Sequence, residues 1–139
     1  MSIGFQVTFD AADPTALARF WALALGYELQ PPPPGWDSWE AWAQAQGIPE
    51  EHWNDMNAVV DPEGSRPRLL FQKVPEGKTA KNRVHLDVNV SGPDHDRSLV
   101  RAHVERLLAA GATLVDEREA RGEFWVVLQD PEGNELCVQ

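Results

Sequence analysis

Several polar side chains with useful chemistry occur at alternate positions of short, strand-like segments. An imidazole and a thiolate are good ligands for zinc and similar metals, an amide carbonyl can also coordinate, and a carboxylate can transfer protons. If the apolar positions of these segments pack against helices, the polar positions share the opposite face of the sheet. The residues that meet this description are Gln6, Thr8, Gln72, Arg83, His85, Asp87, Glu135 and Cys137.

Two other interpretations of this polar face stay open at the level of sequence. Many antiparallel sheets have one solvated polar face with no chemical role. Cys137 near His85 would also resemble a Cys–His nucleophile pair, although neither segment has an obvious group to stabilise an oxyanion. The elements that hold these residues therefore decide what the residues can do.

The chain contains an internal repeat that defines those elements. Asp-Pro-Glu-Gly occurs at 61–64 and again at 130–133, each time as a turn before a strand-like run. Asp13 and Pro14 are typical of a helix start, and Gly26 of a helix end. Each half is predicted to be β-α-β-β-β, with strands at 3–9, 27–30, 57–60 and 67–72 and a helix at 14–25, then strands at 83–90, 112–116, 123–129 and 134–138 and a helix at 93–110.

The first half also contains an insertion rich in tryptophan, residues 31–56. Asp37 and Glu40 are spaced as a capping box for a helix that ends before Gly47, and 49–53 is predicted to add one more helical turn. Trp39, Trp42 and Trp53 are candidate ligand-binding residues, because tryptophan offers a large flat apolar surface for an aromatic ligand. The alternative is that they only anchor the insertion.

Composition limits the class of protein. The chain has 139 residues, a net charge of −10 and one cysteine, Cys137. This charge argues against general nucleic-acid binding, and no apolar run approaches the length of a membrane span. A lone cysteine excludes an internal disulfide and is typical of the cytoplasm, which is the predicted location. Six of the twelve basic residues lie between 66 and 83, either as a solvated linker or as a rim that attracts a small anionic ligand.

Together, the duplicated turn, the strand order, Asn82–Asp87 and Asp130–Glu135 resemble the vicinal oxygen chelate superfamily, in its glyoxalase-like branch. The resemblance covers essentially the whole chain. It implies an α+β fold in which two paired β-α-β-β-β modules form a curved eight-stranded cup, as in glyoxalase, bleomycin-resistance and dihydroxybiphenyl dioxygenase proteins. The expected organisation is a single domain, 1–139, with module one at 1–74, a linker at 75–81 and module two at 82–139.

The resemblance also implies a divalent metal (Zn, Ni, Fe or Mn) held by one residue from each of four strands. The matching positions of this sequence are Gln6, Leu70, His85 and Cys137, and Glu135 lies one pleat from the last of them. Leu70 cannot coordinate a metal, so Gln6, His85 and Cys137 form an incomplete candidate set. In an enzyme, His85 would be a ligand or base and Glu135 an acid or base.

The predicted function is therefore a glyoxalase-like protein that binds a small organic molecule, anionic or aromatic, in the cup between the modules. It would act either as a metal-assisted lyase, isomerase or dioxygenase, or as a non-catalytic protein that sequesters an antibiotic, as in bleomycin resistance. The missing carboxylates and the aromatic insertion favour sequestration, whereas His85 among polar neighbours favours an enzyme. The many large aromatic residues predict a homodimer.

Overall fold

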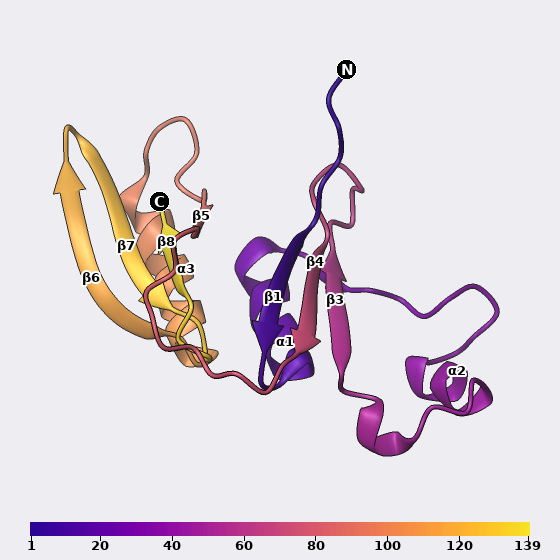
Figure 1. Cartoon of the computed structure of the whole chain (residues 1–139). Coiled ribbons are helices and arrows are strands. Elements are labelled where there is room, and N and C mark those ends of the chain that lie inside the picture. The colour runs from indigo at the N-terminus through magenta and orange to yellow at the C-terminus, as the bar shows by residue number, and fades with distance from the viewer. The chain divides into compact units, whose positions relative to one another are not determined.

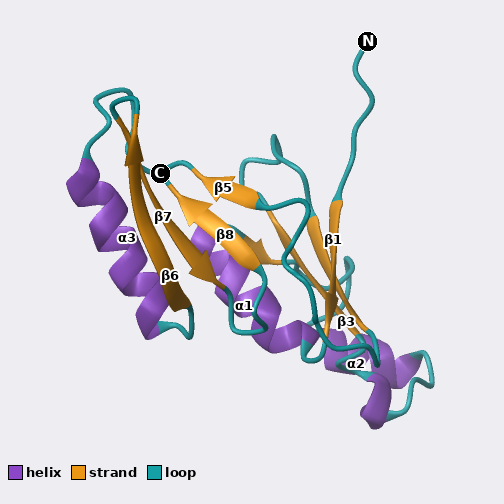
Figure 2. Ribbon diagram, turned by 60° about the vertical axis from the view of Figure 1, so that its left-hand side comes forward, coloured by secondary structure: helices purple, strands orange, loops and turns teal.

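A computed structural model describes all residues, 1–139, and confirms the α+β fold (Figures 1 and 2). The chain forms two compact units. The first contains residues 1–22 and 26–77, and the second contains residues 23–25 and 78–139. Each unit has its own four-stranded sheet.

The first unit contains β1 (Val7–Ala11), most of α1 (Pro14–Leu25), β2 (Glu28–Leu29), α2 (Trp39–Ala45), the 3-10 turn η1 (Glu50–His52), β3 (Met56–Val60) and β4 (Leu69–Lys73). The strand order is β1-β4-β3-β2. β1 pairs with β4 in parallel, and the other pairs are antiparallel. β1 and β4 are therefore far apart in the sequence but lie side by side in the sheet.

The apolar stripe of α1 builds the core of this unit. Asp13 caps the helix by accepting a hydrogen bond from the Ala16 N–H, and Gly26 ends it with φ of 67°, a left-handed conformation that suits glycine. Leu17 and Trp21 are each 1% exposed. The Trp21 ring lies 5.0 Å from that of Phe9, which lies 5.2 Å from Phe71. The helix and the sheet are thus joined by an aromatic cluster.

The second unit contains β5 (Leu86–Val88), α3 (Arg97–Ala109), β6 (Thr113–Ala120), β7 (Glu123–Gln129) and β8 (Glu135–Val138), with strand order β5-β8-β7-β6. α3 covers one face of the sheet, and its contacts fall mainly on β7 and β8 (Figure 2). Val100 and Leu107 of α3 and Leu128 and Leu136 of the sheet are at most 1% exposed. The opposite face of this sheet, called the open face below, carries the polar residues.

The two Asp-Pro-Glu-Gly turns have the same structure. Each joins two antiparallel strands, β3 to β4 and β7 to β8. The buried carboxylate of Asp61 accepts hydrogen bonds from the N–H groups of Glu63, Ser65 and Arg66, and these bonds lower its pKa although burial acts in the opposite direction. Asp130 likewise accepts from the N–H groups of Glu132 and Asn134. The repeat is thus explained by a buried aspartate that ties each turn.

Several predicted boundaries were wrong. β1 begins at Val7 rather than at residue 3, and Ile3 and Phe5 are exposed. α2 is capped by Ser38, whose hydroxyl accepts from the Ala41 N–H, and not by Asp37, because Ser38 has the extended conformation of a cap.

Boundaries in the second half also differ from those predicted. β5 is only three residues long, which leaves Val84 81% exposed. α3 begins at Arg97, after its cap Asp96, because 91–96 forms turns. Leu99 of α3 is exposed, whereas His103 is buried. No helix is both long and apolar enough to cross a bilayer.

Candidate functional site

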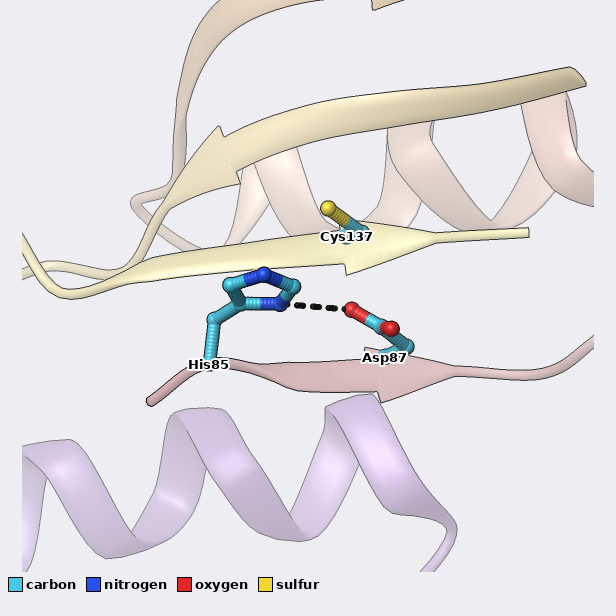
Figure 3. Close-up of side chains that lie close together, drawn as sticks. All are labelled: His85, Asp87 and Cys137. Carbon is cyan, nitrogen blue, oxygen red and sulfur yellow. Dashed lines mark hydrogen bonds and ion pairs between the residues drawn. The ribbon is translucent and has the colours of Figure 1, made fainter. Parts of the chain in front are cut away.

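Three of the predicted side chains come together on the second sheet (Figure 3). His85 lies just before β5, Asp87 lies within β5, and Cys137 lies in β8. Each offers one ligand atom, and these atoms all lie within 4.8 Å of one another. The polar face predicted from alternation therefore contains a compact cluster where β5 and β8 pair.

Strand pairing explains why these residues meet. β5 and β8 are parallel, with Asp87 opposite Cys137 and Val88 opposite Val138. Val88 and Val138 are buried, at 4% and 0% exposure, on the face that packs against α3. Because side chains alternate along a strand, Asp87 and Cys137 project from the open face, on strands about 4.8 Å apart.

His85 and Asp87 form a hydrogen-bonded pair. Nδ1 of His85 lies 2.7 Å from Oδ1 of Asp87, and each side chain is 42% exposed. An ionised carboxylate only accepts hydrogen bonds, so the Nδ1 position holds the hydrogen and Nε2 is left as the basic nitrogen. Asp87 thus orients the imidazole so that Nε2 can accept a proton, a hydrogen bond or a metal.

Cys137 is a protonated thiol rather than a thiolate at neutral pH. Burial raises the pKa of the thiol, and the charge and hydrogen bonding of Asp87 raise it further. Lys81 and Arg118 act in the opposite direction, but the net pKa stays above the ordinary value. Since the thiolate is the nucleophile and the metal ligand, Cys137 is poorly prepared for either role without help.

The donor set of the cluster fits a divalent metal. Nitrogen, oxygen and sulfur ligands together are typical of zinc, and three protein ligands with an open position are typical of catalytic zinc. Tetrahedral zinc with bonds of about 2.0–2.3 Å holds its ligand atoms about 3.3–3.8 Å apart, so these three side chains, whose ligand atoms lie within 4.8 Å of one another, would have to move closer together around a metal. A metal here would have to displace the thiol proton. Asp87, which was predicted to bind ligand, would be the third donor beside His85 and Cys137 in this unit.

The carboxylate of Glu135 binds residues of the linker and its end. Its Oε2 accepts from the Asn82 N–H at 2.9 Å and lies 3.2 Å from Nζ of Lys78. Burial would raise the pKa of Glu135, but the backbone hydrogen bonds from Asn82 and from Glu135 itself, with the Lys78 ammonium, lower it to about 2. A carboxylate held ionised in this way anchors residues 78–82 to β8, and its catalytic role stays a prediction.

The first unit holds the other predicted polar residues. Oε1 of Gln6 accepts from Arg68 at 3.1 Å, and its Nε2 lies 3.5 Å from the Thr8 hydroxyl. Gln72 donates to Asp10 at 2.9 Å across the β1–β4 pair. These side chains form one hydrogen-bonded polar face of that sheet. The assignment of Gln6 as a metal ligand stays a prediction.

The tryptophans of the insertion bond to their own surroundings. The indole N–H of Trp39 donates to the Gln30 carbonyl, and that of Trp53 donates to the Ile48 carbonyl. The rings of Trp39 and Trp42 meet edge to face at 5.5 Å. These contacts stabilise the insertion, and a role as a lid over a ligand stays a prediction. Arg83 is exposed and precedes β5.

Two residues of the open face were missed by the sequence interpretation: Trp125 and Arg118. Trp125 is half-buried in β7, and Arg118 lies opposite it in β6. The alternation of 123–129 around buried Val126 and Leu128 could have identified Trp125. Arg118 could not be placed, because a β-bulge between Leu114 and Asp116 reverses the faces of β6.

Comparison with known proteins identifies the family. The model of the glyoxalase-like domain family matches residues 6–139. The chain belongs to the glyoxalase-like domain family. No curated protein sequence matches the chain.

Solved structures of low sequence identity share this fold. A glyoxalase/bleomycin resistance/dioxygenase family enzyme from Burkholderia phytofirmans is 17% identical, with 96% of this chain and 94% of that chain covered and a TM-score of 0.65. A fosfomycin resistance protein from Mesorhizobium loti is 13% identical, covering 100% and 92%, with a TM-score of 0.61. A bleomycin-binding protein from Streptomyces verticillus, solved with copper(II)-bleomycin, is 18% identical, covering 100% and 96%, with a TM-score of 0.55.

The glyoxalase-like domain is therefore a member of the vicinal oxygen chelate superfamily, as its sequence resemblance implied. Its structural neighbours include both an enzyme and a bleomycin-binding protein. At these identities the likeness establishes the fold alone. The function of this chain has to be argued from its own side chains.

Proposed function

We propose that this glyoxalase-like domain binds a small organic molecule over the open face of its second sheet, with His85 as the main polar contact. The observation that supports the proposal is the 2.7 Å contact between His85 and Asp87, which fixes the imidazole and leaves Nε2 for a ligand. Because Nε2 accepts a hydrogen bond, such an oriented histidine favours recognition of a hydroxyl or a protonated acid group.

Binding without turnover is the form of this function that the site favours. Cys137 keeps its proton, and Glu135 is ionised and occupied by Lys78 and Asn82. Neither group is thus prepared for proton transfer near neutral pH. A sequestering protein needs only a shaped surface with well-placed polar contacts.

A metal-assisted lyase, isomerase or dioxygenase is the second candidate. The convergence of His85, Asp87 and Cys137 within 4.8 Å favours it. His85, Asp87 and Cys137 would hold the metal, which would supply Lewis-acid chemistry to a bound oxygen atom. Zinc is favoured by the thiol, and Ni, Fe and Mn are the other candidates.

The experiment that tests the proposed function is a binding screen on protein purified without a histidine tag. A panel of small aromatic, conjugated and aliphatic compounds, both neutral and anionic, is followed by NMR on the wild type and on His85→Ala, with His52→Ala as the matched control. His52 also contacts an aspartate, Asp55 at 2.9 Å, but lies outside the proposed site. Compounds that bind the wild type and His52→Ala but not His85→Ala support the proposal.

Equal binding to both histidine variants would contradict the proposed site. Metal analysis of the same samples separates the two candidates. If binding of the selected compounds persists after chelation, sequestration is favoured, and if it is lost and returns with zinc, the metal-assisted form is favoured. A homodimer and a cytoplasmic location remain part of this proposal.

A further inference from the structure

The open face of the second sheet has a continuous row of residues that crosses all four strands. Asp87 of β5 pairs with Cys137 of β8, Cys137 pairs with Val127 of β7, and Val127 pairs with Asp116 of β6. Trp125 lies two residues from Val127 and is therefore the diagonal neighbour of Cys137. Diagonal neighbours in a sheet are about 7–8 Å apart, within reach of an aromatic ring.

The position of Phe124 shows which face Trp125 occupies. The guanidinium groups of Arg97 and Arg101, both on α3, lie 5.1 and 4.9 Å from the centre of the Phe124 ring. Phe124 thus faces α3, together with buried Val126. By alternation, Trp125 projects from the open face, on the side of Asp87 and Cys137.

The β-bulge in β6 places Arg118 on the open face. On either side of Val115 the register changes, so that Glu117 and Glu119 face α3, where they pair with Arg101 and Arg97. Arg118 consequently projects from the open face, directly across from Trp125. Its Nε donates to Asp116 at 2.9 Å, which orients the guanidinium and leaves its terminal N–H groups for a ligand.

A second cation, Lys81, acts on the same row. Its ammonium has one long contact, 3.5 Å to the Asn82 carbonyl, and its charge, like that of Arg118, lowers the pKa of the Cys137 thiol. The two aspartates of the row are engaged by His85 and Arg118. Lys81 and the terminal N–H groups of Arg118 therefore flank an apolar strip that consists of Trp125, Val127 and Cys137.

We infer that Trp125 and Arg118 select a flat aromatic carboxylate as the ligand of this face. The ring would lie on Trp125 and Val127, the carboxylate would accept hydrogen bonds from the terminal N–H groups of Arg118, and a polar group at the far end would meet Nε2 of His85. Three strand spacings separate the strand of Arg118 from that of Asp87, about 14 Å. This distance suits a molecule of two fused rings with substituents at both ends. The inference rests on the proposed function and names the class of its ligand.

Three probes of matched shape test the inference. Naphthalene-2-carboxylate has the ring and the charge, naphthalene-2-carboxamide lacks the charge, and decalin-2-carboxylate lacks the flat ring. We expect the aromatic carboxylate to bind with a millimolar or lower Kd, and each of the other two about tenfold more weakly. A charge-assisted hydrogen bond and an aromatic contact each contribute enough for a change of this order.

Variants test whether Trp125 and Arg118 are responsible for the binding of the aromatic carboxylate. Trp125→Leu and Arg118→Gln should each weaken naphthalene-2-carboxylate about tenfold, and Arg118→Lys should weaken it less, because the charge remains. Arg101→Gln is the matched control, since Arg101 also pairs with an acid of β6 but on the α3 face. Trp36→Leu controls for the loss of an exposed tryptophan. Both controls should bind as the wild type does, and thermal unfolding checks that all variants are folded.

The outcomes separate this inference from the proposed function. Equal affinity for the three probes, no binding of the aromatic carboxylate up to roughly 10 mM, or unchanged binding in folded Trp125→Leu and Arg118→Gln would overturn the inference. If in that case other compounds still need His85, the proposed function stands with a different ligand class. If no compound needs His85, the proposed function fails as well.

Discussion

Replacement of Glu135 by glutamine tests whether this carboxylate anchors the linker to β8. Its side chain is 12% exposed and that of Lys78 is 22% exposed, so the pair is largely shielded. The pKa of Glu135 is lowered from 4.5 to about 2. At about 1.4 kcal/mol per pKa unit this decrease corresponds to at most about 3.4 kcal/mol, and solvent screening reduces the expected loss in Glu135→Gln to about 1–2 kcal/mol at pH 7.

The assay is hydrogen exchange at the backbone amides of Leu136 and Val138, which belong to β8, in the wild type and in Glu135→Gln. Because the folded-state pKa lies below the ordinary value, the stabilisation is present above pH 4.5 and is lost as the pH falls from 4.5 toward 2. The difference between the two proteins should therefore shrink over this range. Glu123→Gln, at an exposed end of β7, is the control. Equal protection of both proteins at pH 7, or a difference that persists at pH 2, would refute the anchoring role.

Four further predictions concern other parts of the molecule. Asp130→Ala should lower the free energy of unfolding by about 2–4 kcal/mol, because the N–H groups of Glu132 and Asn134 lose their acceptor. Urea denaturation measures this loss, and a value below about 0.5 kcal/mol would contradict the prediction. The tag-free protein should be folded without metal and bind zinc weakly near pH 7, because Cys137 holds its proton; stoichiometric metal after purification, lost in His85→Ala, would show the opposite. Burial lowers the pKa of His103 below 6.5, and its Nε2–H donates to the Ala24 carbonyl, so the free energy of unfolding should fall as the pH drops below 6.5. A free energy of unfolding that does not change with pH over this range, as in His103→Gln, would exclude this cause. Sedimentation at micromolar concentration should give twice the 15.5 kDa chain mass, and a 15.5 kDa species would disprove the homodimer.

Local signals in the sequence were sufficient for most of the fold. Alternation identified β7 and β8, Asp13, Pro14 and Gly26 identified α1, and the repeated turns paired the last two strands of each half. The errors lie at the ends of helices and strands. Asp96 and Pro93 both precede an apolar stripe, and only the turns at 91–96 set the start of α3 at Arg97.

The candidate site was predictable in part for similar reasons. His85, Asp87 and Cys137 share a face by simple alternation, and strand pairing brings them together. The partners of Glu135 could not be predicted, since the backbone N–H of Asn82 has no signature in the sequence. The face on which Arg118 lies depends on one extra residue in the β6–β7 pairing, and simple alternation along the sequence cannot reveal this bulge.

That extra residue, Val115, has a consequence for solubility. β6 is the outermost strand of its sheet and has eight exposed residues, and its two large apolar residues, Leu114 and Val115, are each 51% exposed. Such an edge would be a template for aggregation if its backbone groups were evenly spaced. The bulge interrupts that spacing and twists the strand, so a neighbouring chain cannot add a regular strand along its whole length. Deletion of Val115 should therefore produce a straighter edge on which separate molecules associate into insoluble β-structure.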